Sequence, residues 1–534
     1  MLLKLLKNFF KNKYQLLVLL FFIVFLLLGI FIYKDYGISW DEGVNRTRGE
    51  ETYNYILTGE WNLPQVEIGK YHGTAFVALL TIFEKIFNFG NDLQKVYYFR
   101  HLCNFLLFYV SVFFFYLLNR KIFGSWKIGL LACFFLILSP RIFADSFYNP
   151  KDLPFLSVFI ISVFTLLNYL ENKTFIRATI HAIVCSFLIG IRILGIMVPL
   201  LTFIFFILDF IFKKNEIKKP ISKKLSSIFL FLIATIGFTI LFSPILWENP
   251  IHNFIQNFKQ MSSFPWDGSV LFLGRFVKAD SLPWYYSILW IIITTPLMYT
   301  TLFIIGCINT IYNFLNAPLA YYRKSHIFLI ILVSFLLPII SVIVSKSVLY
   351  DGWRQLFFVY PLLLIISIYG LSNIYSFLIK FYKNTKWKIV PQILFYFIII
   401  VVISSLANIS FFMIKYHPHQ NVYFNFIAGK NIREKFELDY WGLSYRQAFE
   451  YILRLDKSES ISIKVANHPG HLNYIILNSE DQKRIKFVDN IDEAKYFLTE
   501  YRSHPDNYPY DNEFYSIIVK GEKIMTIYYF QEND

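Results

Sequence analysis

Long apolar segments recur through the first three quarters of this sequence, separated by short polar stretches. A run of about 20 apolar residues can cross the hydrocarbon core of a bilayer as a helix, and soluble domains interrupt such runs much earlier. We therefore predict an α-helical polytopic membrane protein with about eleven transmembrane helices. The predicted spans lie at 15–33, 97–118, 128–140, 153–170, 178–191, 194–212, 226–246, 286–312, 326–344, 356–379 and 389–413.

The composition supports this fold class. Hydrophobic residues make up 56% of the chain and charged residues only 16%, against about 25% charged in ordinary soluble domains. A soluble enzyme and a disordered chain are thereby excluded. Because all four cysteines lie in apolar segments, neither a cysteine-ligated metal nor a disulfide framework is expected.

The lysines and arginines predict the orientation, because cytoplasmic loops carry an excess of these residues. We expect a multi-pass protein of the cell (inner) membrane, with a cytoplasmic N-terminus and an extracytoplasmic C-terminal domain. The net charge of +15 then reflects topology and suits anionic lipid headgroups, so no nucleic acid partner is needed. The residues assigned to the cytoplasmic side are Lys4, Lys7, Lys11, Lys13, Arg120, Lys121, Lys127, Lys173, Arg177, Lys213, Lys214, Lys218, Lys219, Lys223, Lys224, Arg323, Lys324, Lys383, Lys386 and Lys388.

Two domains follow from this pattern. Residues 1–413 form the transmembrane domain, with a large first outer loop at 34–96 in which 73–87 is predicted to be a helix lying at the interface. Residues 414–534 are more polar and are predicted to form a small extracytoplasmic α/β domain. Ser444 and Gln447 resemble a capping box that opens a helix ending near Leu455. Strands are predicted at 461–465, 485–488, 496–498, 514–519 and 523–530.

The candidate catalytic residues are carboxylates on the predicted outer side. Asp41 and Glu42 follow the first span by about eight residues, and Asp152 lies in an unusually polar loop between two spans. A carboxylate at the membrane surface can accept the proton of an attacking hydroxyl. The alternative for Asp41 and Glu42 is a solvated acidic pair in a loop.

Basic residues at the same level are candidate phosphate ligands, because arginine offers permanently charged, bidentate contacts to phosphate oxygens. Arg192 lies at an outward tip between two apolar runs, where it could instead be a snorkelling charge at a helix end. His72 could add a hydrogen-bond donor, although a lone histidine in a loop is more often only hydrogen-bonded. The full set of candidates is Arg192, Arg100, Arg354, His72 and Lys151.

The order of these motifs resembles the C-type, polyprenyl-phosphate-dependent glycosyltransferases, in particular bacterial relatives of protein O-mannosyltransferases and aminoarabinose transferases (glycosyltransferase family 39). The resemblance covers nearly the whole membrane portion. The segments that carry it are Asp41-Glu42, Asn149-Pro-Lys-Asp152-Leu-Pro154, Leu282-Pro-Trp-Tyr-Tyr286, Tyr350-Asp-Gly-Trp-Arg354, 417–425 and 436–445.

The resemblance implies transfer of a sugar from a polyprenyl-phosphate donor to an acceptor hydroxyl of a protein, lipid or glycan, with inversion at the anomeric carbon. It implies Asp41 as catalytic base, Asp152 as the second acidic motif and Arg192 as a phosphate contact. No metal ligands are predicted, and a requirement for a divalent metal is left open.

Two other functions fit some of these features. A transporter or flippase of lipid-linked sugars would distribute charges through its spans, whereas the charges here gather at span ends. A membrane anchor that presents the C-terminal domain as a binding module would leave the polar loop around Asp152 and Arg192 unexplained.

Overall fold

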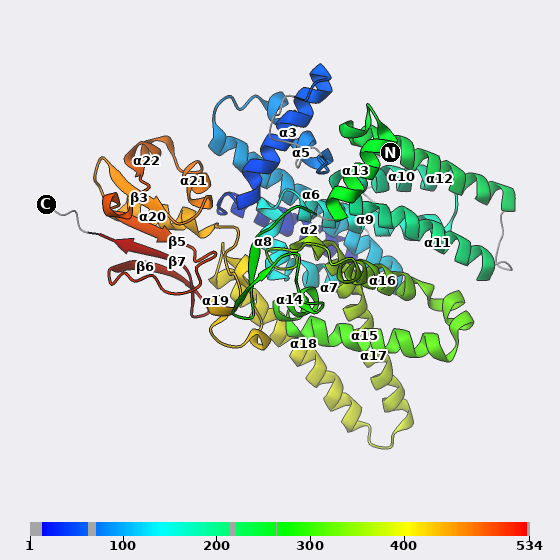
Figure 1. Cartoon of the computed structure of the whole chain (residues 1–534). Coiled ribbons are helices and arrows are strands. Elements are labelled where there is room, and N and C mark those ends of the chain that lie inside the picture. Colours follow the sequence, from blue (N-terminus) through cyan, green and yellow to red (C-terminus); the bar gives the residue numbers. More distant parts are fainter. Residues whose placement is uncertain (1–12, 62–70, 213–219, 263, 531–534) are drawn as a thin grey trace.

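The computed structural model describes residues 13–61, 71–212, 220–262 and 264–530. Figure 1 shows a helical bundle with a small domain of strands and short helices at one end. The predicted fold class is confirmed. Several of the basic residues used to assign the topology lie outside the described residues: Lys4, Lys7, Lys11, Lys213, Lys214, Lys218 and Lys219.

Nine helical segments within the described ranges are long and apolar enough to span a membrane. Helix α9 is the most enclosed by protein, and α18 the least, so α9 is central and α18 faces lipid. The helices concerned are α2 (Lys13–Ile32), α6 (Leu93–Phe123), α9 (Asp152–Glu171), η1 (Ile193–Ile196) with α11 (Met197–Phe212), α12 (Ile221–Phe242), α15 (Leu297–Asn316), α16 (Pro318–Val344), η4 (Arg354–Val359) with α17 (Tyr360–Asn384), and α18 (Ile389–Lys415).

All eleven predicted segments are helical, but three differ from a simple span. The segment at 128–140 is α7 (Trp126–Ile137), which continues after a 71° bend as α8 (Pro140–Tyr148). The segment at 286–312 is divided into α14 (Tyr286–Thr294) and α15 at Pro296, whose missing N–H and fixed φ favour the start of a helix. Helix α10 (Phe175–Ile191) has only 17 residues.

The segment between α2 and α6, predicted as the first outer loop, is largely helical in its described part. Besides the predicted helix, found as α5 (Ala75–Phe87), it contains α3 (Trp40–Thr58), which the sequence did not suggest because α3 is polar on all sides. The two helices touch at Gly49, where a Cβ would lie only 2.5 Å from the carbonyl oxygen of Val77. The segment between α12 and α14 contains α13 (Pro250–Ser262) and the hairpin β1 (Ser269–Phe272) with β2 (Arg275–Lys278).

The C-terminal domain is the predicted α/β unit. Its sheet has the order β4-β3-β5-β7-β6, with parallel pairs among the first three strands and antiparallel pairs after them. The strands are β3 (Ile461–Val465), β4 (Ile485–Phe487), β5 (Tyr496–Thr499), β6 (Glu513–Val519) and β7 (Glu522–Tyr529). The helices are α19 (Ile432–Lys435), α20 (Ser444–Leu455), α21 (Pro469–Tyr474) and α22 (Ser479–Arg484).

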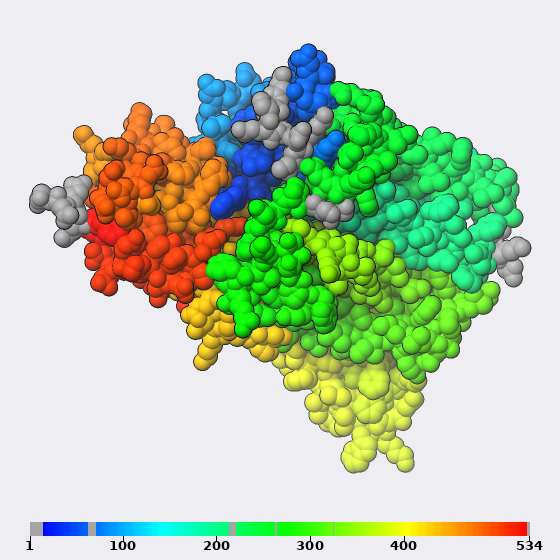
Figure 2. All heavy atoms as spheres, in the orientation of Figure 1, coloured from blue at the N-terminus to red at the C-terminus, as the bar shows by residue number. Residues whose placement is uncertain are grey.

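The helix predicted from Ser444 is present as α20, but its expected capping box is not formed. Leu443 occupies the N-cap position, and the amide N–H of Ser444 donates instead to Asp439 at 2.8 Å. In Figure 2 the orange and red C-terminal domain lies directly against the blue segment that contains α3. This contact brings the last part of the chain to the candidate site.

Candidate active site

The start of α3 is held by a capping box that separates Asp41 from Glu42. The Glu42 carboxylate accepts the amide N–H of Ser39 at 2.7 Å and pairs with His101 at 2.9 Å. Its side chain is 1% exposed and points into the protein. Glu42, expected as a catalytic candidate, is therefore placed where it fixes the helix terminus and not beside Asp41.

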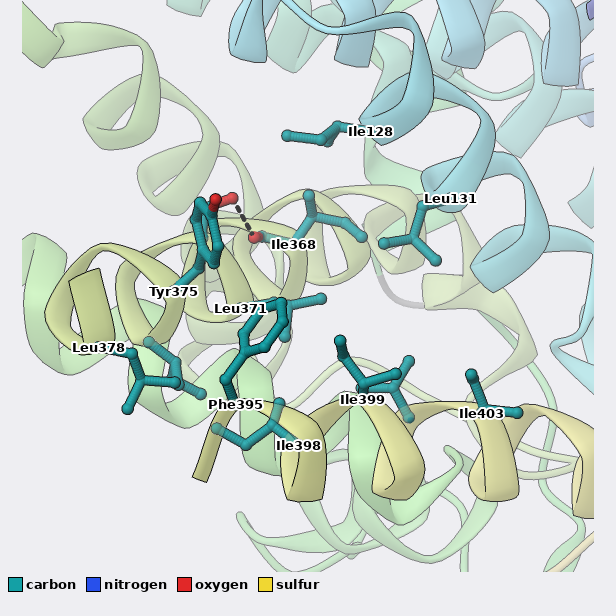
Figure 3. Close-up of a pocket in the computed structure, with 13 residues that line it drawn as sticks. Ile128, Leu131, Ile368, Leu371, Tyr375, Leu378, Phe395, Ile398, Ile399 and Ile403 are labelled. Atoms are coloured by element: carbon teal, nitrogen blue, oxygen red, sulfur yellow. Dashed lines mark hydrogen bonds between the residues drawn. The ribbon is translucent and has the colours of Figure 1, made fainter. Parts of the chain in front are cut away.

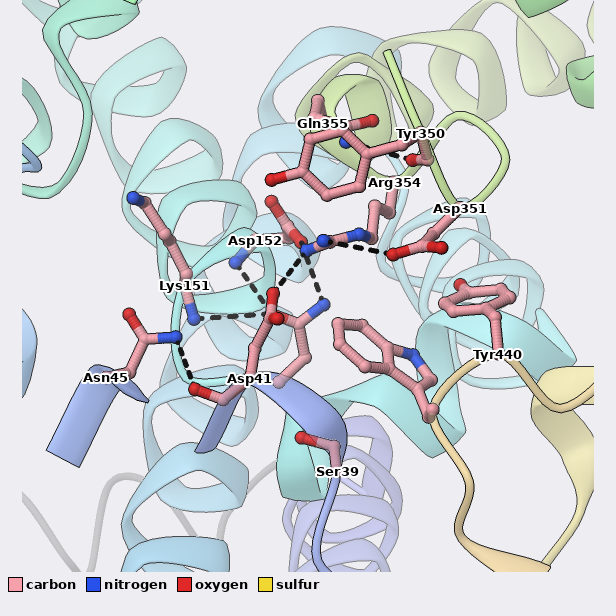
Figure 4. A network of polar contacts seen from close by, with 12 residues as sticks. Ser39, Asp41, Asn45, Lys151, Asp152, Tyr350, Asp351, Arg354, Gln355 and Tyr440 are labelled. Atoms are coloured by element: carbon pink, nitrogen blue, oxygen red, sulfur yellow. Dashed lines mark hydrogen bonds and ion pairs between the residues drawn. The ribbon is translucent and has the colours of Figure 1, made fainter. Parts of the chain in front are cut away.

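Asp41 lies on the open side of this helix turn, with its side chain 32% exposed. Its Oδ2 pairs with Nη1 of Arg354 at 2.9 Å, and its backbone carbonyl accepts the Asn45 amide at 2.8 Å. Figure 4 shows Asp41 from α3 and Asp152 from α9 reaching toward the same guanidinium. Residues from distant parts of the sequence thus meet at one point.

Asp152 is the first residue of α9 and is 1% exposed. Asn149 orients it twice, accepting the Asp152 N–H at 2.8 Å and donating to Oδ2 at 3.0 Å. The carboxylate pairs with Arg354 at 3.1 Å and with Arg192 through Oδ1. Because its oxygens are engaged by two arginines and an amide, Asp152 is a structural centre of the cluster.

Arg354 is buried between aromatic rings. Its guanidinium carbon lies 4.7 Å from the ring centroids of both Tyr350 and Trp441, and its side chain is 2% exposed. It also pairs with Asp351 at 3.2 Å. Stacking and ion pairs together allow this arginine one orientation.

The C-terminal domain contributes Arg502 to the same network. Arg502 pairs with Asp351 at 2.8 Å, donates to the Tyr440 carbonyl at 2.6 Å, and stacks on Trp40 at 4.6 Å. Arg502 was not a sequence candidate, since nothing in its surroundings marks it. The chain of contacts from Arg502 through Asp351 to Arg354 links the domain to Asp41.

The side-chain amide of Asn473 connects the C-terminal domain to the segment before α3 by hydrogen bonds. Its Oδ1 accepts the Ile38 N–H at 2.9 Å, and its Nδ2 donates to the Ile38 carbonyl at 2.9 Å and to that of Gly442 at 3.0 Å. The Trp40 N–H donates to the Trp441 carbonyl at 3.1 Å. These bonds define the position of the residues that precede Asp41.

Three basic side chains lie beside Asp41 and Asp152: Arg192, Lys151 and Arg48. Arg192 is 17% exposed and is the one held by Asp152. Burial, with Arg192 and Arg48 next in effect, lowers the pKa of the Lys151 ammonium well below its ordinary value. The pKa of Arg48 is also lowered by burial, against the opposing effect of Asp41. Arg192 and Arg48 make this side of the site positively charged, and an anion bound beside them would favour the charged form of Lys151.

Arg48 was also missed in the sequence, although a signal for it existed. Asp41, Asn45 and Arg48 are spaced at i, i+4 and i+7, which places them on one face of a helix. Once α3 is known to be helical, this spacing places Arg48 on the same face of the helix as Asp41.

Arg100 does not join the cluster. It is 1% exposed, forms an ion pair with Glu84, and donates to Thr81 at 3.2 Å. Both partners lie on α5, whereas Arg100 lies on α6. The structure therefore places Arg100 in a helix-to-helix contact, because its own helix turns it toward α5 and away from Arg354.

His72 lies close to the cluster but behind an aromatic layer. Gly73 packs against the end of α10, where a Cβ would lie 2.4 Å from the Ile191 carbonyl oxygen, next to Arg192. The His72 ring contacts Phe264 edge-on at 5.3 Å, and Phe264 in turn stacks at 6.2 Å on Tyr350. His72 thus supports the wall of the site.

Within the described ranges, no three His, Cys, Asp or Glu side chains are close enough together to hold a metal ion.

A separate apolar cavity of about 360 Å³ lies between α7, α17 and α18 (Figure 3). Aliphatic and aromatic side chains form most of its wall, among them Leu131, Leu371 and Phe395. Such a lining suits a hydrocarbon chain and offers no catalytic group.

Comparison with known proteins identifies the fold. The chain matches no protein-family model and no curated protein. The crystal structure of ArnT from Cupriavidus metallidurans in the apo state matches with a TM-score of 0.50 and 12% identity, covering 95% of this chain and 97% of that chain. The same protein bound to undecaprenyl phosphate gives a TM-score of 0.48 at 12% identity, covering 97% and 98%. The likeness to the apo structure shows that this chain shares the ArnT fold, the fold implied by the resemblance in the sequence.

Proposed function

We propose that this protein is a membrane glycosyltransferase that moves a sugar from a polyprenyl-phosphate donor to an acceptor hydroxyl on the outer face. The observation that carries the proposal is the exposure of the Asp41 side chain. It is 32% exposed, whereas the side chains of Asp152 and Asp351 are 1% and 6% exposed. Asp41 is the carboxylate of the cluster that an acceptor can reach. Its neighbours are the cations that a phosphate requires.

Asp41 is suited to act as the general base. Arg354 holds its Oδ2, while its Oδ1 makes no hydrogen bond or ion pair with any described residue. In the proposed step the acceptor oxygen attacks the anomeric carbon as its proton passes to Asp41. The bond from that carbon to the phosphate oxygen breaks, and its electron pair leaves with the polyprenyl phosphate. Attack from the side opposite the phosphate inverts the anomeric carbon.

Arg192, Lys151 and Arg48 are the proposed phosphate contacts. Of these three, Arg192 is the one that forms an ion pair with a described carboxylate, and a bound phosphate would counter the charges of Arg192 and Arg48 and favour the charged form of Lys151. The arginine forks can bind two phosphate oxygens each and stabilise the charge that grows as the phosphate departs. Arg354 and Asp152 would keep Asp41 and Arg192 at a constant separation.

The same observations favour transfer over transport. The charged residues of the spanning helices lie near the helix ends, for example Asp152 and Glu171 at the two ends of α9. A flippase would need polar groups along a path through the bilayer. Transfer of a sugar from a phosphate donor to a hydroxyl acceptor requires only the charged groups of the cluster around Asp41 and Arg354.

The test is to incubate the purified protein in detergent with a panel of radiolabelled polyprenyl-phosphate sugars and candidate acceptors. A transferase releases polyprenyl phosphate and forms a glycosidic product, or hydrolyses its donor slowly. A flippase forms no new covalent product in detergent, because no membrane separates two sides there. If no donor gives any product, the transferase assignment fails.

The orientation is proposed from the basic loops and needs its own test. Single cysteines at Ser460 and Ser222, both exposed, would be labelled with an impermeant reagent on intact cells. We expect labelling at position 460 and none at 222. The reverse pattern would place the site on the cytoplasmic face.

A further inference from the structure

Helix α13 presents its apolar side chains to the outside of the molecule. Ile251, Ile255 and Phe258 are 79%, 46% and 51% exposed. They are spaced at i, i+4 and i+7, so they lie together on one side of the helix, which we call the apolar face of α13. A helix at the surface of a soluble domain turns its apolar stripe toward the core, and α13 does the opposite.

The opposite side of α13 is polar and packs against the bundle. Asn253 and Asn257, at i and i+4, are only 7% and 8% exposed. The side-chain amide of Asn253 donates to the carbonyl oxygen of Ile245 at 2.6 Å. Ile245 lies in η3 (Pro244–Leu246), the short turn that follows α12. Helix α13 is therefore attached to the protein through its polar residues, and its apolar face is left for another partner.

A third side of the helix is both exposed and polar. It carries His252 and Lys259, which are spaced at i and i+7, and Lys259 is the only charged residue in α13. At 3.6 residues per turn this side lies about a quarter of a turn from the apolar face. A helix that lies flat on a bilayer has this arrangement, because its apolar face enters the acyl boundary while a polar flank meets headgroups and water.

The apolar face of α13 follows directly in the chain on a lipid-facing helix. Ile236 and Leu241, near the end of α12, are 64% and 57% exposed, as expected for side chains that contact acyl chains. Trp247, between the two helices, is 42% exposed, and its indole N–H donates to the Ile240 carbonyl at 2.8 Å. Tryptophan is enriched at the level where spans leave the hydrocarbon. Exposed apolar side chains thus continue from α12 through Trp247 to Ile251.

We propose that the apolar face of α13 inserts into the bilayer at the boundary between lipid headgroups and acyl chains. Its place just after a span, the preceding tryptophan and its lack of charge favour a lipid surface over a protein partner.

The attachment of α13 to lipid has a consequence for the candidate active site. In Figure 1 the helix lies beside the ends of α10 and α12. It contacts η1, which begins directly after Arg192, so a membrane-bound α13 places Arg192 near the bilayer surface. The proposal concerns the fold and stands whether or not the protein is a transferase.

The experiment measures the surroundings of a fluorescent label on the full-length protein, reconstituted into phosphatidylcholine vesicles. The test variant is Ile255→Cys, and the matched control is His252→Cys, an exposed position on the polar flank of the same helix. Nitroxide-bearing lipids quench a label that lies in the bilayer, and iodide quenches a label that lies in water. The protein without an introduced cysteine, labelled in parallel, gives the background from its four native cysteines.

We expect lipid nitroxides to quench the label at position 255 about twofold more than the label at position 252, most strongly when the nitroxide is near the headgroup end of the acyl chain. Iodide should quench in the reverse order. Equal lipid quenching at both positions, or stronger iodide quenching at position 255, would overturn the proposal. Protection of position 255 from both quenchers, with energy transfer between labelled copies, would assign the face to a second copy of the chain and also overturn it.

Discussion

The two ends of α9 carry charge in different ways. At the Asp152 end, arginines are buried and stacked on aromatic rings, with the Arg354 side chain only 2% exposed. At the Glu171 end, lysines pair with carboxylates at the edge of an open cavity, and Lys121 is 26% exposed. A stacked guanidinium network can maintain the geometry that a reaction needs, whereas the lysine–carboxylate pairs at the other end connect neighbouring segments of the bundle. The predictions below begin with the network at the Asp152 end.

The largest effect is expected from Asp41→Asn. The amide keeps the shape of the side chain and loses its basicity, so the transfer rate should fall by about 10² to 10⁴ with folding intact. The measurement is product formation by mass spectrometry with a matched donor and acceptor. The control is Asp280→Asn, an exposed carboxylate in the segment after β2, which should retain full activity. Near-normal turnover in Asp41→Asn would transfer the base role to another carboxylate.

Arg192 tests whether a guanidinium at the Asp152 end contacts the donor phosphate. Arg192→Ala should lose about 10- to 100-fold in donor kcat/KM, and Arg192→Lys should keep part of the activity, because lysine retains the charge without the fork. Equal transfer activity in the wild type and both Arg192 variants would remove this residue from the site.

Arg502 tests whether the C-terminal domain positions the cluster. Arg502→Gln should lower kcat by about tenfold and change the donor KM little, because Arg502 acts on Asp41 through Asp351 and Trp40 and forms no ion pair with Asp41 itself. Asp351→Asn should have a similar effect, and the double variant should be no worse than either single one. Additive losses, or a change confined to KM, would contradict a positioning role for this chain of contacts.

The smallest effect concerns pH. Arginines stay charged at any working pH, but burial raises the pKa of Glu500 in the C-terminal domain to about 7. Because this pKa lies above that of the unfolded chain, the stabilising contribution is complete below about pH 4.5 and is lost as the pH rises through about 7. The apparent Tm should fall by roughly 2–4 °C across this window, and less in Glu500→Gln. A Tm that falls equally in both proteins would exclude Glu500 as the cause.

The sequence was most informative where periodicity dictates structure. The strand at 461–465 matches β3 at both ends, and apolar length located the helices, because both patterns depend on local repetition. Proline breaks shortened the spans at Pro140 and Pro296, which hydropathy alone does not register. The polar helix α3 was missed, since no apolar stripe marks it.

The candidate site was predictable in part. Asp41, Asp152, Arg192, Arg354 and Lys151 do come together, while Arg100 packs against α5 and Glu42 caps α3. All of these residues carry a charge near a span end, so residue type alone could not distinguish the residues of the cluster from those that stabilise the helices. Arg502 could not be predicted from the sequence, because its role depends on how the C-terminal domain packs against the bundle.

That docking has a consequence for biosynthesis. The residues before Asp41 are made early and are held by Asn473 and Trp441, which leave the ribosome only after all the spans. A chain interrupted before residue 473 carries every membrane helix and yet lacks the bonds that seat the start of α3. The cluster around Arg354 is therefore assembled only after residue 473 has been translated, so a product truncated before it would contain Asp41 without the contacts that position it.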